Sequence, residues 1–111
     1  MDVIDWNSLK ENCAGDDALV NEILELFRKE GPALLADVQR AVASGDGLTI
    51  KRTAHRLKGA LVSLAAHPAT AVAKELEHAG AQNELSRVAD LQKQLETEMT
   101  RLMGVVSSRA A

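Results

Sequence analysis

Apolar residues recur three or four positions apart along most of the chain, the spacing of one face of an α-helix. One stripe consists of Leu19, Val20, Ile23, Leu24 and Phe27, continued past Gly31-Pro32 by Leu34, Leu35, Val38 and Val42. A second consists of Leu85, Val88, Leu91, Leu95, Met99 and Leu102. Polar residues separate these positions, so the pattern predicts long amphipathic helices.

Helix start and stop signals divide these stripes. Asp5 and Asp16 suit the N-cap position of two successive helices, the first of which ends near Cys13. Pro32 lacks the N–H of a regular helix, so the stripe from Leu19 to Val42 is predicted to form either two abutting helices or one kinked helix.

A second group of signals sets the later boundaries. Gly45 suits the left-handed position after a helix, and Asp46 can cap a third helix that runs to about Ala66. His67-Pro68 stops that helix and starts the fourth, and Gly80 is predicted to end the fourth helix.

Helices joined by connections this short must fold back on one another. We therefore expect an all-α fold, an antiparallel up-and-down four-helix bundle with a short additional N-terminal helix. Residues 1–106 are predicted to form one domain, and residues 107–111 a disordered tail.

Composition and charge exclude several classes of function. Apolar residues make up 46% of the 111-residue chain but aromatics only 2%, as in helical bundles. A net charge of -3 without a basic tract argues against nucleic-acid binding. With no leader-like N-terminus, no apolar run of about 20 residues and a single cysteine, Cys13, the sequence indicates a cytoplasmic protein without membrane insertion.

A helical wheel over residues 47–66 separates two faces. The apolar face is formed by Ile50, Thr53, Ala54, Leu57, Ala60, Leu61 and Leu64. The opposite face is formed by Lys51, Arg52, His55, Lys58, Gly59 and Val62. His55 is thus predicted to point into solvent from the middle of a basic strip.

A lone exposed histidine is usually only a solvated surface residue, but His55 has unusual neighbours. Lys58, one turn later, is placed to balance the charge of a phosphoryl group on the ring. Gly59 costs roughly 1 kcal/mol in a helix interior relative to Ala, which suggests that close approach to the ring is needed. Lys51, Arg52 and Val62 would extend a surface for an acidic partner.

The segment Ala54-His55-Arg56-Leu57-Lys58-Gly59-Ala60 resembles the A-H-x-L-K-G-[SA] signature of histidine phosphotransfer (HPt) domains. Similar residues extend the resemblance over about residues 4–103, among them Ile4-Asp5, Leu9, Gly15-Asp16, the Leu/Phe pattern through Phe27, and Leu76-Glu77. One position departs, because the family commonly has glycine where this chain has Ala65. This departure puts partner fit at that position in question.

The resemblance implies a phosphocarrier of two-component phosphorelays, a monomer with no cofactor or bound metal. His55 would accept a phosphoryl group from a receiver-domain aspartate or a sensor histidine kinase and pass it to another receiver domain, with Mg²⁺ held by the receiver. Glu77 is a candidate to orient the His55 ring, and Lys74 a candidate to help hold the phosphate.

Two other functions remain open at this point. One is a helical adaptor that binds a partner without chemistry, and the other is a phosphoacceptor module from a larger hybrid or chemotaxis-type kinase. An enzyme with its own ATP site is disfavoured, because no phosphate-binding loop is present. A metal site formed by His67 and His78 with Glu77 and His55 is also disfavoured, because no ligand spacing supports it.

Overall fold

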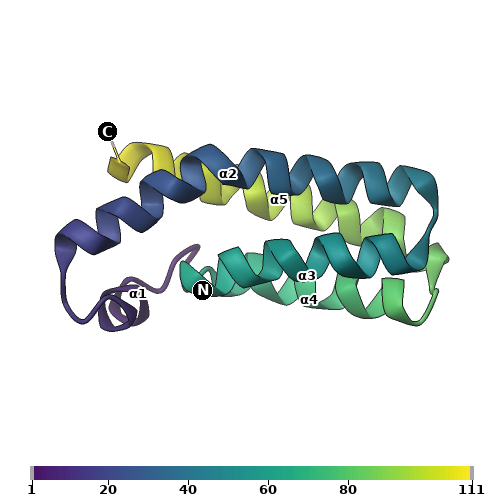
Figure 1. Cartoon of the computed structure of the whole chain (residues 1–111), viewed down its shortest axis with the longest axis horizontal. Coiled ribbons are helices and arrows are strands. Elements are labelled where there is room, and N and C mark those ends of the chain that lie inside the picture. The colour runs from purple at the N-terminus through teal and green to yellow at the C-terminus, as the bar shows by residue number, and fades with distance from the viewer. Residues whose placement is uncertain (1, 111) are drawn as a thin grey trace.

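Five helices account for most of the chain in the computed structural model, which describes residues 2–110 (Figure 1). They are α1 (Trp6–Asn12), α2 (Asp17–Ser44), α3 (Gly47–Ser63), α4 (His67–Ala81) and α5 (Leu85–Ala110), and this part of the chain contains no strand. The molecule is elongated, with principal extents of 41 × 21 × 21 Å.

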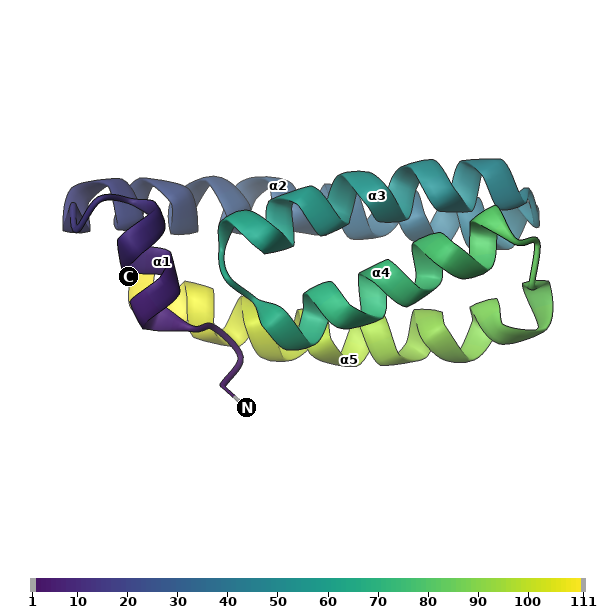
Figure 2. The same ribbon diagram turned by 90° about the horizontal axis from the view of Figure 1, so that it is seen from below.

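The four long helices form an antiparallel bundle, as the sequence predicts. α3 packs against α2 and α4, and α5 packs against the same two helices from the other side (Figure 2). The short helix α1 lies at the end of the bundle where α2 begins and α5 ends. The sequence-based expectation of an all-α bundle with one additional N-terminal helix is therefore confirmed.

Aspartates cap three of the helices, as their positions in the sequence predict. The Asp5 carboxylate accepts a hydrogen bond from the Ser8 N–H at 3.1 Å, and Asp16 accepts one from the Ala18 N–H at 2.9 Å. Asp46 accepts one from the Leu48 N–H at 3.1 Å. Each bond satisfies a backbone donor that lacks a partner within its helix, and the Asp46 bond fixes the start of α3.

Pro32 does not divide the second helix. α2 is continuous over 28 residues, so the alternative of two abutting helices is wrong. Buried residues on both sides of the proline, Phe27 and Val38, anchor the helix in the core. This packing offsets the backbone hydrogen bond that proline cannot donate.

Three helix ends use a non-glycine residue in the left-handed conformation. Ala14, Ala65 and Asn83 have φ of 54°, 54° and 56° and follow α1, α3 and α4. α3 ends at Ser63, three residues before the predicted Ala66, and α4 runs on to Ala81. The prediction that Gly80 ends α4 is therefore wrong, because Asn83 takes the left-handed position.

Gly80 instead allows α4 to approach α3 closely. A Cβ on Gly80 would lie 2.8 Å from both the Gly47 carbonyl oxygen and the Lys51 nitrogen. A Cβ on Gly47 would lie 2.6 Å from the Gly80 carbonyl oxygen. Only glycine at both positions permits this contact, which fixes how α3 and α4 lie against each other.

The C-terminal helix is longer than predicted. α5 includes residues 107–110, so the expected disordered tail is wrong for these residues, while Ala111 lies outside the described residues. Val106 is fully buried, and the Arg109 guanidinium lies 4.7 Å from the centre of the Trp6 ring. These contacts hold the last turns of α5 against α1. No helix among residues 2–110 has an apolar stretch long enough to cross a membrane.

Candidate functional site

The two faces predicted for α3 are present in the structure. Ile50, Ala54, Leu57, Leu61 and Leu64 are buried in the core, whereas Lys51, Arg52, His55, Gly59 and Val62 are exposed. Lys58 is partly buried. The His55 side chain is 66% exposed, in the middle of the outer face of α3.

The His55 ring is held by the neighbouring helix α4. Nδ1 of His55 lies 2.9 Å from Oε2 of Glu77, whose side chain is only 18% exposed. Because a carboxylate can only accept, this hydrogen bond places the proton of the neutral ring on Nδ1. Nε2 then carries the free lone pair, and it has no hydrogen-bond partner among the described residues.

Lys58 contacts the second oxygen of the same carboxylate. Its ammonium lies 2.7 Å from Oε1 of Glu77, and the Lys58 side chain is 25% exposed. This ion pair is short enough for a hydrogen bond, and it compensates the burial of the Glu77 carboxylate. Glu77 thus joins His55 and Lys58, which lie one turn apart on α3.

Glu77 remains ionised at neutral pH in this arrangement. Burial alone would raise the pKa of its carboxyl group, but the contacts with Lys58 and His55 outweigh burial and lower the pKa. A fixed negative charge therefore faces Nδ1 of the ring, while the opposite side of the ring faces solvent.

Basic side chains surround the ring on its solvent side. A surface hollow is lined by Lys51, Arg52, His55, Arg56 and Glu77. On a helical wheel Arg56 lies between the two faces, so the sequence pattern alone does not assign it to the site. The hollow therefore combines one reactive ring with three cationic side chains.

Lys74 is exposed on α4, one turn before Glu77, and forms no ion pair with a carboxylate in the described part of the chain. It does not line the hollow around His55. The structure thus brings Glu77 to the ring but leaves Lys74 outside the contacts of the site.

Gly59 has no packing role within the described residues. A Cβ built on it would meet no atom within 4 Å. Val62, one turn further along, is 54% exposed. Ala65 is buried, and its left-handed backbone explains a preference for glycine there better than contact with a partner does.

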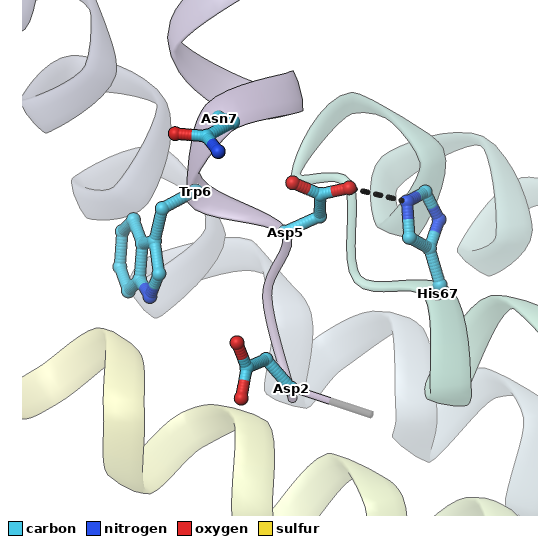
Figure 3. A pocket seen from close by; sticks show the side chains of 5 residues that line it. All are labelled: Asp2, Asp5, Trp6, Asn7 and His67. Carbon is cyan, nitrogen blue, oxygen red and sulfur yellow. Dashed lines mark ion pairs between the residues drawn. The ribbon is translucent and has the colours of Figure 1, made fainter.

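The remaining histidines lie away from this site. Nε2 of His67 is 3.4 Å from Oδ2 of Asp5, in a pocket that Asp2, Trp6 and Asn7 also line (Figure 3). His67 is ten residues before Glu77 in α4, about 15 Å along the helix. His78 is exposed. Residues 2–110 contain no group of three or more His, Cys, Asp or Glu side chains placed to hold a metal ion.

The structure is thus an all-helical bundle in which the exposed imidazole of His55 is oriented by a mostly buried carboxylate. Residues 22–104 match the family model described as the Hpt domain, and the chain belongs to this family. Its function is accordingly histidine phosphotransfer in a phosphorelay, and proteins of this family are phosphocarriers.

A solved structure shows the same fold. The histidine-containing phosphotransfer protein B (HptB) from Pseudomonas aeruginosa PAO1 superimposes with a TM-score of 0.89 at 23% sequence identity. The alignment covers 97% of this chain and 94% of the HptB chain. A comparison with curated protein sequences gave no match.

Proposed function

We propose that His55 is the residue that carries the phosphoryl group, and that Nε2 is the atom to which it is bound. One observation supports this assignment above all: the exposed ring is bonded through Nδ1 to a buried carboxylate, which leaves Nε2 directed away from its anchor. The alternative of an adaptor without chemistry gives no reason for this arrangement.

The transfer step requires little of the chain beyond positioning and charge balance. The Nε2 lone pair forms the N–P bond while the P–O bond to the donor aspartate breaks, and the aspartate carboxylate leaves with the electron pair. The ring proton stays on Nδ1, where Glu77 accepts its hydrogen bond and balances the positive charge that develops on the ring. When the phosphoryl group moves on to the acceptor, the acceptor aspartate forms the new P–O bond. The N–P bond then breaks, and Nε2 regains its lone pair.

The neighbouring residues divide the remaining tasks. Lys58 would balance the charge of the phosphoryl group, and this requires its ammonium to leave Oε1 of Glu77 or to bridge both groups. Gly59 would keep open the space beside the ring that a partner needs. Lys74, which is exposed one turn from Glu77, would add positive charge on the side of α4.

The partners follow from this chemistry. Receiver domains of response regulators, and a sensor histidine kinase, would supply or accept the phosphoryl group, with Mg²⁺ bound by the receiver. Lys51, Arg52 and Val62 would contribute to the surface on which they dock. Under this proposal the chain acts as a cytoplasmic monomer without an ATP site of its own.

Phosphorylation with a labelled receiver domain tests the assignment. A receiver domain is phosphorylated with acetyl phosphate and Mg²⁺, incubated with the chain, and the label is followed on the chain. We expect label that is stable in base and labile in acid, as for a phosphoramidate bond, and no label on His55→Gln. The exposed His78→Gln serves as the matched control. Labelling of His55→Gln equal to that of the wild type would show that the assignment is wrong.

A further inference from the structure

Two of the exposed large apolar side chains lie on the same stripe of α3 as His55. Leu48 is 52% exposed and Val62 is 54% exposed. Leu48 precedes His55 by seven residues, and Val62 follows it by seven. Seven residues make almost two full helical turns, so all three side chains lie within about 20° of one direction, with about 10.5 Å between neighbours.

Both side chains lie outside the buried core of the bundle. α3 is anchored by its opposite face, where Ile50, Ala54, Leu57 and Leu61 are buried. Scattered apolar side chains are common on protein surfaces and by themselves mean little. The symmetrical position of these two about the reactive ring is what distinguishes them.

The surface between the two apolar residues is basic. Lys51, Arg52 and Arg56 are exposed there, and Lys58 is partly exposed. The one acidic group that lines the hollow around His55 is Glu77, which is mostly buried and paired with Lys58. This concentration of positive charge in a chain of net charge -3 fits a partner whose contact surface is acidic at its centre.

We propose that Leu48 and Val62 are two apolar anchors on which the partner receiver domain docks. The proposal rests on the proposed function of His55. The anchors lie about 21 Å apart, so they would hold the acidic phosphorylation pocket of the receiver over His55. The partner must therefore carry apolar side chains on two opposite sides of that pocket. Receivers that lack either of them would be poor donors.

Kinetics of phosphotransfer test this docking role. Leu48→Ser, Val62→Ser and the double variant are compared with the wild-type chain, using a receiver domain that labels the wild type. We expect KM for the phosphorylated receiver to rise about fivefold for each single variant. The reason is that roughly half of each apolar side chain is exposed in the free chain and would be buried by the docked receiver. The double variant should raise KM about 25-fold, with the rate at saturating receiver unchanged. Leu85→Ser is the control, because Leu85 is 42% exposed on α5 and should leave KM unaltered.

The outcomes separate the docking role from the function of His55. Unchanged KM in both single variants, with His55 still labelled, would overturn the docking role alone. A lower saturating rate at unchanged KM would also overturn it, because Leu48 and Val62 would then act on the ring and not on docking. If the wild-type chain accepts no label from any receiver domain, the proposed function fails and the docking role fails with it. Thermal unfolding midpoints equal to that of the wild type would show that the variants are folded.

Discussion

Replacing Gly59 with alanine should stabilise the protein and impair its function. Gly59 lies inside α3, and its missing Cβ faces open space with no atom within 4 Å. Alanine at such a position gains about 1 kcal/mol of helix stability, and no steric cost within the described residues opposes the gain. For a domain of this size, that free energy raises the thermal unfolding midpoint by about 4 °C.

The same methyl group should obstruct phosphotransfer. It would lie one turn from His55, on the outer face of α3, where a partner must approach the ring for in-line transfer. We expect Gly59→Ala to slow transfer from a phosphorylated receiver roughly tenfold, or more if the partner backbone approaches closely. The measurements are thermal unfolding by circular dichroism and the initial rate of labelling.

Gly104 provides a matched control. It is an exposed glycine inside α5, and a Cβ on it would also meet no atom within 4 Å. Gly104→Ala should therefore raise the unfolding midpoint by a similar amount and leave the transfer rate unchanged. If Gly59→Ala transfers as fast as Gly104→Ala, Gly59 has no role in the site. If Gly59→Ala lowers the midpoint, the conclusion that its Cβ would meet only open space is wrong.

Three further predictions concern the ring, the helix caps and the left-handed residues. Glu77→Ala should slow transfer to His55 about tenfold or more, because the ring loses its fixed orientation. Glu77→Gln keeps a hydrogen-bond acceptor and should slow transfer less. Equal transfer rates in the two variants would exclude ring orientation as the cause. Hydrogen bonds from the Thr49 side chain and the Leu48 N–H lower the pKa of Asp46 from 3.8, so its contribution to stability is complete above about pH 4 and is lost as the pH falls through the lowered value. Unfolding in urea between pH 2 and 7 should therefore show a weaker pH dependence for Asp46→Asn than for the wild type, and an unchanged dependence would contradict this. Ala14→Gly should raise the free energy of unfolding by about 0.5 kcal/mol, because glycine adopts the left-handed conformation without strain. Ala65→Gly should give no net gain in the free energy of unfolding, because it also removes a buried methyl group. Urea unfolding of both variants checks the difference.

The local signals in the sequence predict most of the fold. The aspartate caps begin α1, α2 and α3 as expected, because capping depends on residues only two or three positions apart. The two faces of α3 also follow from spacing alone. The effect of Pro32 on the helix could not be decided from the sequence, because the residues that pack against α2 on both sides of Pro32 come from distant parts of the chain. The C-terminal turns of α5 were missed because their contact with Trp6 is tertiary.

The candidate site could be predicted only in part. The position of His55 on an exposed basic strip follows from the wheel. The contact between His55 and Glu77 depends instead on how α3 lies along α4, which no local pattern specifies. The same limit applies to Lys58, whose pairing with the Glu77 carboxylate was not expected from its place on α3. Lys74 was a plausible neighbour by spacing, but the structure leaves it outside the hollow around the ring.

The contact between Gly47, at the start of α3, and Gly80, near the end of α4, affects how His55 and Glu77 are placed relative to each other. Gly47 lies on the helix that carries His55, and Gly80 lies on the helix that carries Glu77. A side chain at either glycine must push the two helices apart, since the nearest atom it would meet belongs to the backbone of the other helix. A random screen for loss of phosphotransfer should therefore recover changes at both glycines, although Gly47 is about 12 Å along α3 from His55. Transplanting the site into another helical bundle would likewise require this glycine pair, and not only the motif around the histidine.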